Sequence, residues 1–375
     1  MSAQAGRARY VMIGGFLGAG KTTAVAALAR HLGSRGLRCG LIANDQSTGL
    51  VDTKLLRSRG YAVEEIAGGC FCCRFDSLRE AAARLTAETR PDVFVAEPVG
   101  SCTDLVATVS YPLRRIYGDR FEVAPLSVMV DPLRAARILG LERGPSFSRK
   151  VVYVYLKQLE EADLILVNKC DRIDELRRER LRGALRDRFP RAEVLACSAR
   201  EGQGLEEWFE RVLSAELPER STMELDYDTY AEGEALLGWL NCTVRLRAAG
   251  SVDGNRLLLE LAEGIGRRLA GAGREVAHLK MTLDSPDAGG LSVVSVVAGG
   301  EEPDLRESLL GEVREGGLIV NLRAEADPEL LERWTRESLK AVAGARPGLA
   351  VELEHSEHFR PARPVPTHRV SGGVP

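Results

Sequence analysis

Four residues near the amino end have the types and the spacing of a phosphate-binding loop. Gly15, Gly20, Lys21 and Thr22 fit the pattern G-x-x-x-x-G-K-[ST]. Glycines allow a tight turn whose N–H groups face phosphate oxygens, and the following helix adds the positive end of its dipole. The lysine would reach the β- and γ-phosphates, and the threonine hydroxyl would bind Mg²⁺. The predicted phosphate-site residues are Gly15, Gly18, Ala19, Gly20, Lys21, Thr22 and Thr23, with Lys21 also catalytic.

A second cluster consists of three cysteines within four residues: Cys70, Cys72 and Cys73. Thiolates are soft ligands that favour Zn²⁺, Cu⁺ or iron–sulfur iron. A closed zinc site needs a fourth ligand, and the chain has no second cysteine pair of suitable spacing. The cluster therefore predicts an open or transferable metal site. The alternatives are a redox-labile thiol cluster and a chance grouping of cysteines in a glycine-rich turn. The other cysteines are scattered, and most are expected to be small core residues: Cys39, Cys102, Cys170, Cys197 and Cys242.

Asn168, Lys169 and Asp171 form an N-K-x-D sequence directly after an apolar run. An aspartate here can accept two hydrogen bonds from the N–H groups on the edge of guanine, whereas adenine lacks that donor pair. Such a site rejects adenine because the carboxylate would lose its partners. The alternative is an ordinary strand-to-helix turn with the aspartate as N-cap. Ser198 and Ala199, after the next strand, are predicted to support the base from the other side.

Carboxylates at three more strand ends are candidates for binding Mg²⁺ or positioning water near the γ-phosphate. Glu97 begins an E-P-V-G sequence, Asp45 follows Asn44, and Asp131 ends another apolar run. An acidic residue with a nearby glycine suits a loop that senses the γ-phosphate through Mg²⁺ or a positioned water. Glu97 and Asp45 are predicted to orient water or complete the Mg²⁺ shell, and the sequence alone does not rank these carboxylates.

The elements that must position these groups alternate between apolar strands and helical patterns. The expected strands are 9–13, 38–44, 62–66, 92–97, 124–130, 163–168 and 193–196. The expected helices include 21–32, 76–89, 103–116, 172–188 and 205–215. Near-continuous apolar strands covered by helices predict a mostly parallel α/β sheet. Ligands of such sheets bind at the carboxyl ends of the strands, where the motifs above fall.

The alternation stops at residue 217, and a second domain is expected after a linker. The predicted organisation is a P-loop domain over 1–216, a linker over 217–233, an α+β domain over 234–358 and a disordered tail over 359–375. The second domain is expected to be ferredoxin-like with an extra strand. Its expected elements are strands 239–247, 275–283, 290–298, 318–324 and 349–354, helices 255–269 and 328–343, and a polar excursion with a short helix over 301–314.

Composition limits the partners. The chain has 375 residues, 45% hydrophobic and 28% charged, with a formal net charge of −3. This near-neutral balance gives no reason to expect nucleic acid or an anionic membrane as partner. No apolar run has the length of a transmembrane helix, and residues 1–9 lack the apolar centre of a signal peptide. A cytoplasmic location is the default expectation.

The combination of GFLGAGKTT, GCFCC, E-P-V-G and N-K-x-D with a separate C-terminal domain resembles the CobW family of P-loop GTPases. The resemblance covers roughly residues 10–215 and implies a metallochaperone. GTP and Mg²⁺ would order a site in which Cys70, Cys72 and Cys73 hold Zn²⁺, Co²⁺ or a similar ion, and hydrolysis would release it to a client protein. The chain departs from the family pattern in having Asp45 where a glutamate is usual, and Gly68 where an asparagine is frequent.

The sequence thus predicts a Mg²⁺-dependent GTPase with slow intrinsic turnover that delivers a transition metal to a client metalloprotein. A homodimer is compatible with it. Two other classes stay open. One is a nucleotide-switched adaptor or assembly factor for a cofactor-dependent enzyme, such as a corrinoid one, with structural or redox thiols. The other is an ATPase that carries an iron–sulfur cluster.

Overall fold

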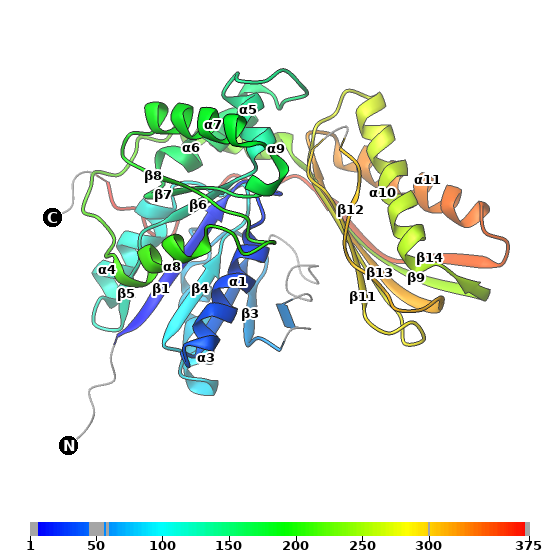
Figure 1. Cartoon of the computed structure of the whole chain (residues 1–375), viewed down its shortest axis with the longest axis horizontal. Coiled ribbons are helices and arrows are strands. Elements are labelled where there is room, and N and C mark those ends of the chain that lie inside the picture. The colour runs from blue at the N-terminus through cyan, green and yellow to red at the C-terminus, as the bar shows by residue number, and fades with distance from the viewer. Residues whose placement is uncertain (1–6, 45–55, 58–59, 299–300, 372–375) are drawn as a thin grey trace. The chain divides into compact units, whose positions relative to one another are not determined.

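The computed structural model describes residues 7–44, 56–57, 60–298 and 301–371. The chain forms two compact units (Figure 1). The P-loop unit comprises residues 1–144, 152–230 and 364–375, and the C-terminal unit comprises 145–151 and 231–363. The division after residue 230 falls within the segment expected to be a linker.

The P-loop unit is built on a parallel sheet, as predicted. Its strands are β1 (Ala8–Gly15), β2 (Cys39–Asn44), β3 (Val63–Ile66), β4 (Val93–Glu97), β5 (Phe121–Val123), β6 (Ser127–Val130), β7 (Leu164–Val167) and β8 (Glu193–Ala196). The order along the sheet is β3-β2-β4-β1-β6-β7-β8, and β5 pairs with the beginning of β1. Every pairing is parallel, so the carboxyl ends of the strands share one edge.

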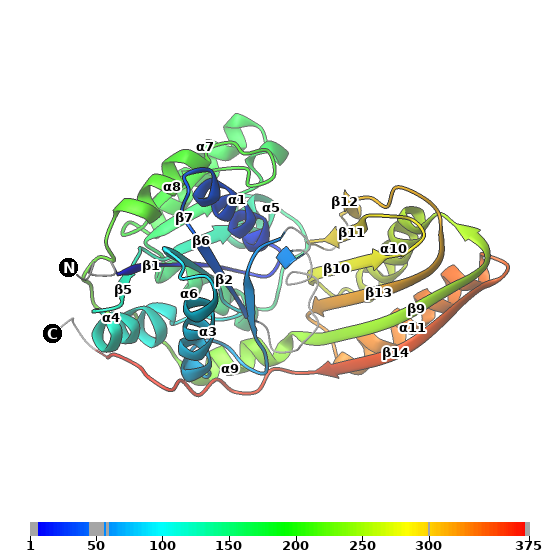
Figure 2. The same ribbon diagram turned by 90° about the horizontal axis from the view of Figure 1, so that it is seen from below.

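Helices cover both faces of this sheet. They are α1 (Lys21–Ser34), α3 (Phe75–Glu88), α4 (Tyr111–Tyr117) after a π-helical turn (Val106–Ser110), α5 (Pro132–Ile138), α6 (Arg149–Glu160), α7 (Glu175–Arg188) after a 3-10 turn (Cys170–Arg172) and α8 (Leu205–Ser214). A further helix, α9 (Tyr227–Leu236), begins in this unit and ends in the C-terminal unit. Figure 2 shows α1 and α8 on one side of the strands and α3 and α4 on the other. Val11, Val25 and Trp208 belong to one buried cluster that joins β1, α1 and α8. Burial on both faces explains why central strands such as β4, β6 and β7 are almost entirely apolar, whereas the edge strand β3 contains two glutamates.

The C-terminal unit has the predicted α+β architecture. Its elements are β9 (Gly238–Val252), α10 (Gly254–Gly271), β10 (Val276–Asp284), β11 (Leu291–Val296), β12 (Asp304–Glu307), β13 (Val313–Ala324), α11 (Pro328–Gly344) and β14 (Leu349–Phe359). The six strands form an antiparallel sheet in the order β12-β11-β10-β13-β9-β14. Without β11 and β12 this is the ferredoxin-like β-α-β-β-α-β connection. The short helix expected within 301–314 is wrong: β12 and the beginning of β13 lie there, because pairing with β11 and β9 decides this polar segment.

Two expectations about the connecting segments differ from the structure. Leu217, at the start of the expected linker, is buried, and its N–H donates to the Val123 carbonyl at 3.1 Å. The segment 364–371, expected to be disordered, runs in an extended course along the P-loop unit past α3 (Figure 2). Composition shows that such segments cannot build a core, but it does not show whether backbone hydrogen bonds to an existing domain hold them.

Candidate functional site

The glycine loop after β1 has the conformation that its sequence pattern requires. Gly15 and Gly20 have φ angles of 125° and 94°. A Cβ on Gly15 would lie 2.3 Å from the carbonyl oxygen of Met129, so no larger residue fits. Lys21 begins α1 and is buried, with its Nζ 3.5 Å from the carbonyl oxygen of Phe16. The loop therefore needs its glycines for backbone conformation and close approach.

Side chains from distant elements hold the outer side of this loop. Their hydrogen bonds run from Arg134 to the Leu17 carbonyl, from Lys169 to the Gly18 carbonyl at 2.8 Å, and from Asn168 to the Ala19 carbonyl at 2.8 Å. Because the C=O of a trans peptide and the N–H that follows it point to opposite sides, these bonds direct N–H groups of the loop inward. This is the arrangement that binds phosphate oxygens. Lys169 and Asn168 belong to the predicted site, but no sequence signal marked Arg134, since only the fold brings it to the loop.

Asp131, a candidate Mg²⁺ ligand from sequence, has other partners. Its carboxylate lies 2.9 Å from Lys169 Nζ and accepts a hydrogen bond from the Arg134 N–H at 3.0 Å, which caps α5. Burial opposes ionisation of this carboxyl group, but Lys169 and Arg134 outweigh it and lower its pKa to about 2. Asp131 therefore acts as a buried anion that positions the two cations holding the loop.

Thr22 and Glu97 meet at the position predicted for Mg²⁺. The Thr22 hydroxyl donates to Glu97 Oε1 at 3.0 Å, and both residues are buried. A hydroxyl and a carboxylate oxygen are the hard ligands that Mg²⁺ prefers. Asp45, the other predicted carboxylate, lies outside the residues that the structure describes.

The N-K-x-D sequence connects the loop to the segment after β8. Asn168 Oδ1 accepts a hydrogen bond from the Ala199 N–H at 2.9 Å, while its amide holds the glycine loop. Ser198 is buried, and its hydroxyl accepts from the Glu201 N–H at 3.1 Å. Asp171 is exposed on the 3-10 turn, so its carboxylate is accessible to a ligand. The structure thus brings the predicted base-binding residues to the same edge as the phosphate loop.

The three cysteines form a compact sulfur cluster between β3 and α3. The Sγ–Sγ distances are 2.7 Å for Cys70–Cys72, 3.3 Å for Cys70–Cys73 and 3.6 Å for Cys72–Cys73. Gly68 and Gly69 precede it with φ angles of 77° and 146°, a turn that other residues rarely adopt. Cys70 and Cys72 are buried and Cys73 is half-buried. Three sulfurs this close fit one soft metal ion.

The protonation of the cluster is uneven. Hydrogen bonds from neighbouring thiols, first that of Cys102 and then those of Cys72 and Cys73, lower the pKa of Cys70 well below its ordinary value. The hydrogen bond to Cys70 raises the pKa of Cys72, and the same cause raises that of Cys73 to about 11. Of the three thiols, Cys70 therefore loses its proton most readily, and the thiolate is the form that binds a metal ion.

Asn44 links the sulfur cluster to the nucleotide edge. It ends β2, and its side-chain amide donates to the carbonyl oxygens of Ile66 at 2.9 Å and Gly69 at 2.7 Å. The residue before it, Ala43, is in register with Glu97 on β4. The cysteine loop and the Thr22–Glu97 contact are therefore held by adjacent strand ends.

Residues 364–371, here called the C-terminal strap, lie over the sulfur cluster. The Val365 N–H donates to Cys73 Sγ at 3.2 Å, and the Thr367 N–H donates to the Cys72 carbonyl at 2.8 Å. Arg369 forms an ion pair with the buried Asp104 at 2.7 Å. Backbone and ionic contacts therefore hold the strap against the metal-ligating candidates.

Ending the chain at Arg363 is expected to expose Cys73. Because the strap's N–H group and chain cover the Cys73 sulfur, we expect alkylation of this thiol by iodoacetamide to speed up by about fivefold or more. Mass spectrometry of the labelled peptides measures the rate. Cys39, half-buried at the start of β2, is the internal control and should react equally in both chains. An unchanged Cys73 rate would show that the strap does not protect it.

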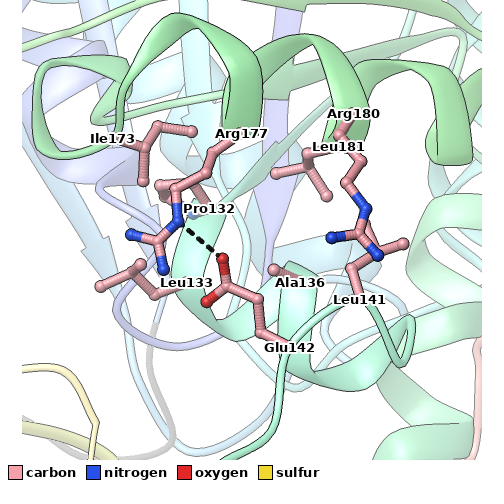
Figure 3. A pocket seen from close by; sticks show the side chains of 9 residues that line it. All are labelled: Pro132, Leu133, Ala136, Leu141, Glu142, Ile173, Arg177, Arg180 and Leu181. Atoms are coloured by element: carbon pink, nitrogen blue, oxygen red, sulfur yellow. Dashed lines mark ion pairs between the residues drawn. The ribbon is translucent and has the colours of Figure 1, made fainter.

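A surface pocket lies between α5 and α7 (Figure 3). Arg177 and Glu142 form an ion pair of 3.0 Å at its wall, and Pro132 and Leu181 supply apolar surface. None of the predicted nucleotide or metal residues is among the nine that line it. Over the described ranges, no helix has both the length and the apolar character to cross a membrane.

A glycine loop between a strand and a helix defines a P-loop nucleotide-binding protein, and here an N-K-x-D sequence lies at the same edge of the sheet. A family model, the CobW/HypB/UreG nucleotide-binding domain, matches residues 9–196. The chain belongs to this family.

Curated relatives carry zinc-related names. The chain is 28% identical over 213 residues to "Zinc-regulated GTPase metalloprotein activator 1" of Dictyostelium discoideum, which covers 49% of this chain and 44% of that protein. It is 28% identical over 167 residues to "Zinc chaperone YeiR" of Escherichia coli, covering 44% and 47%. It is 29% identical over 191 residues to "Zinc chaperone CobW" of Sinorhizobium sp, covering 46% and 53%. The matches span about half the length of these relatives.

Two solved structures are also similar. The Zn(II)-bound YjiA GTPase of E. coli is 17% identical with a TM-score of 0.39, over 90% of this chain and 99% of that one. HypB of Helicobacter pylori in complex with nickel is 18% identical with a TM-score of 0.42, over 56% and 87%. The likeness to both is weak.

Proposed function

We propose that this protein is a Mg²⁺-dependent GTPase that couples hydrolysis to the binding of a transition metal ion and its delivery to a client protein. The cargo is Zn²⁺ or Co²⁺, for which a thiolate set is suited. The observation that supports this most is the sulfur cluster held by Asn44 beside the strand end that carries Glu97. The zinc-related names of the relatives agree with it.

The residues around the nucleotide have different roles, set by the charge of each side chain. Inward N–H groups of the glycine loop and Lys21 neutralise the phosphates, while Thr22 and Glu97 hold Mg²⁺ or a water next to the γ-phosphate. Asp171 reads guanine, because its exposed carboxylate accepts from both N–H groups of the base edge. Asn168 holds the segment that carries Asp171 against the phosphate loop, because its side-chain amide donates to the Ala19 carbonyl.

The metal residues respond to the nucleotide through shared strands. GTP and Mg²⁺ at the Thr22–Glu97 contact restrain the end of β4, and β2 passes this restraint to Gly69 through Asn44. A restrained cysteine loop loses less conformational freedom on binding metal, so its affinity rises. By linkage, the metal strengthens nucleotide binding by the same factor.

A metal titration tests this coupling. We expect a non-hydrolysable GTP analogue with Mg²⁺ to raise the affinity for Co²⁺ or Zn²⁺ by about tenfold or more, a coupling of roughly 1.4 kcal/mol or more. Thiolate-to-cobalt absorbance measures the bound Co²⁺, and competition gives the Zn²⁺ affinity. Cys72→Ser should remove most of the effect.

Cys39→Ser is the matched control, since this cysteine lies at the opposite end of β2 from Asn44. It should bind metal like the unmodified chain. Equal metal affinity with and without the GTP analogue would contradict the coupling and favour a nucleotide-switched adaptor whose thiols are structural. An ATP preference, or an iron–sulfur absorption spectrum, would favour the iron–sulfur ATPase.

A further inference from the structure

Cys102 lies beside the sulfur cluster, although its place in the sequence suggests only a core residue. It follows β4 by five residues and is 1% exposed. Its thiol hydrogen-bonds with the Cys70 thiol, so a fourth sulfur adjoins one of the three in the C-x-C-C motif. It does not lie within 4.8 Å of all three, which form a group of their own. Its backbone is fixed, since its N–H donates to the Val99 carbonyl at 3.0 Å and its carbonyl accepts from Gln158 Nε2 at 2.8 Å.

A tetrahedral metal ion bound by Cys70, Cys72 and Cys73 needs a fourth ligand next to these sulfurs. A tetrahedral site with Zn–S bonds of about 2.3 Å holds its sulfurs about 3.8 Å apart. The three measured separations, 2.7 to 3.6 Å, are shorter, so the thiols must spread when an ion enters. A fourth sulfur in contact with Cys70, on the loop after β4, can then complete the shell.

We propose that Cys102 is the fourth sulfur ligand of the transferable metal site and, in addition to Asn44, a residue through which the nucleotide sets metal affinity. This inference rests on the proposed metal-binding function. With four thiolates the ion is held tightly, and with three it is held in an open shell from which a client can take it. Removing one ligand is thus the chemical event of release.

The loop that carries Cys102 contacts the phosphate loop at two points. At its start, Glu97 accepts the hydrogen bond of Thr22. In its middle, a Cβ on Gly100 would lie 3.0 Å from the Leu17 backbone nitrogen and 2.7 Å from its side chain, so the two loops touch where only glycine fits. If loss of the γ-phosphate shifts Glu97, the movement therefore reaches Cys102, which lies only five positions further along the same loop. Among the described cysteines, Cys102 alone both contacts the sulfur cluster and lies on a loop that touches the phosphate loop.

Counting sulfurs tests the proposal without a variant. X-ray absorption at the zinc edge of the full chain, with Mg²⁺ and a non-hydrolysable GTP analogue, should give four sulfur ligands, and with GDP three. Three sulfurs in both states would overturn the assignment of Cys102. Four in both states would overturn its role in release.

Cobalt absorbance of variants separates this inference from the proposed function. With the GTP analogue, Cys102→Ser should lower the thiolate-to-cobalt intensity by about a quarter, weaken Co²⁺ binding by about tenfold and reduce the effect of nucleotide to about twofold or less. Cys102→Ala should do the same, which excludes the serine hydroxyl as the cause. Cys242→Ser, a buried cysteine of the C-terminal unit, is the control and should bind Co²⁺ normally.

The outcomes are distinct. If Cys72→Ser loses the cobalt band while Cys102→Ser keeps the full band and affinity, metal binding stands and this inference is wrong. If the unmodified chain shows no thiolate-to-cobalt band, the proposed function itself is wrong. Retained GTP binding by each variant shows that the fold is intact.

Discussion

Replacing Lys21 by alanine is expected to lower GTP hydrolysis by on the order of 10²–10³-fold. Lys21 is buried at the start of α1, and we propose that its ammonium is the charged donor for the transferring phosphoryl group. Neither the helix dipole nor the N–H groups of the loop can replace a full charge. Single-turnover hydrolysis of GTP with Mg²⁺ measures the loss.

Lys340→Ala is the control, because this lysine is exposed on α11 and lies in no proposed site. Its turnover should match that of the unmodified chain. Metal affinity without nucleotide should be unchanged in both variants, since neither touches the sulfur cluster. A Lys21→Ala chain with normal hydrolysis would exclude the glycine loop as the catalytic centre.

Replacing Asp171 by asparagine is expected to change the base that the protein prefers. Each hydrogen bond to the carboxylate contributes about 1.5–3 kcal/mol, so loss of two weakens GTP on the order of a hundredfold or more. The asparagine amide can instead donate to the 2-oxo group of xanthine, so XTP should become the better ligand. Competition of GTP, ATP and XTP against a fluorescent nucleotide measures the preference.

Asp187→Asn is the matched control, an exposed aspartate in the last turn of α7. It should keep the GTP preference. If Asp171→Asn also keeps it, guanine is read elsewhere, and the residue is only part of the turn before α7.

Much of the nucleotide site follows from local sequence. Gly15, Gly20 and Lys21 lie within seven consecutive positions, so their spacing alone predicts a phosphate-binding loop. Asn168 and Asp171 were predicted as base-binding residues in the same way, and the parallel order of the strands places them at the edge that carries the glycine loop. The cysteine motif is equally local, since neighbouring residues cannot be far apart in any fold.

The ferredoxin-like layout of the second unit also followed from its apolar patterns, because period and length distinguish its strands from its helices. The error at 301–314 arose where the pattern is weak. There β12 pairs as an edge strand, and a polar edge strand has little apolar alternation to mark it.

By itself, the sequence determined that this is a P-loop protein with a soft-metal motif, because those features depend on residues a few positions apart. Only the tertiary structure brought Arg134 to the carbonyl of Leu17, Cys102 to Cys70, and the C-terminal strap to Cys73. The last of these contacts joins Cys73 to Val365 across 292 positions of chain. No spacing rule covers such contacts, because they depend on strand order and on where each loop leaves the sheet.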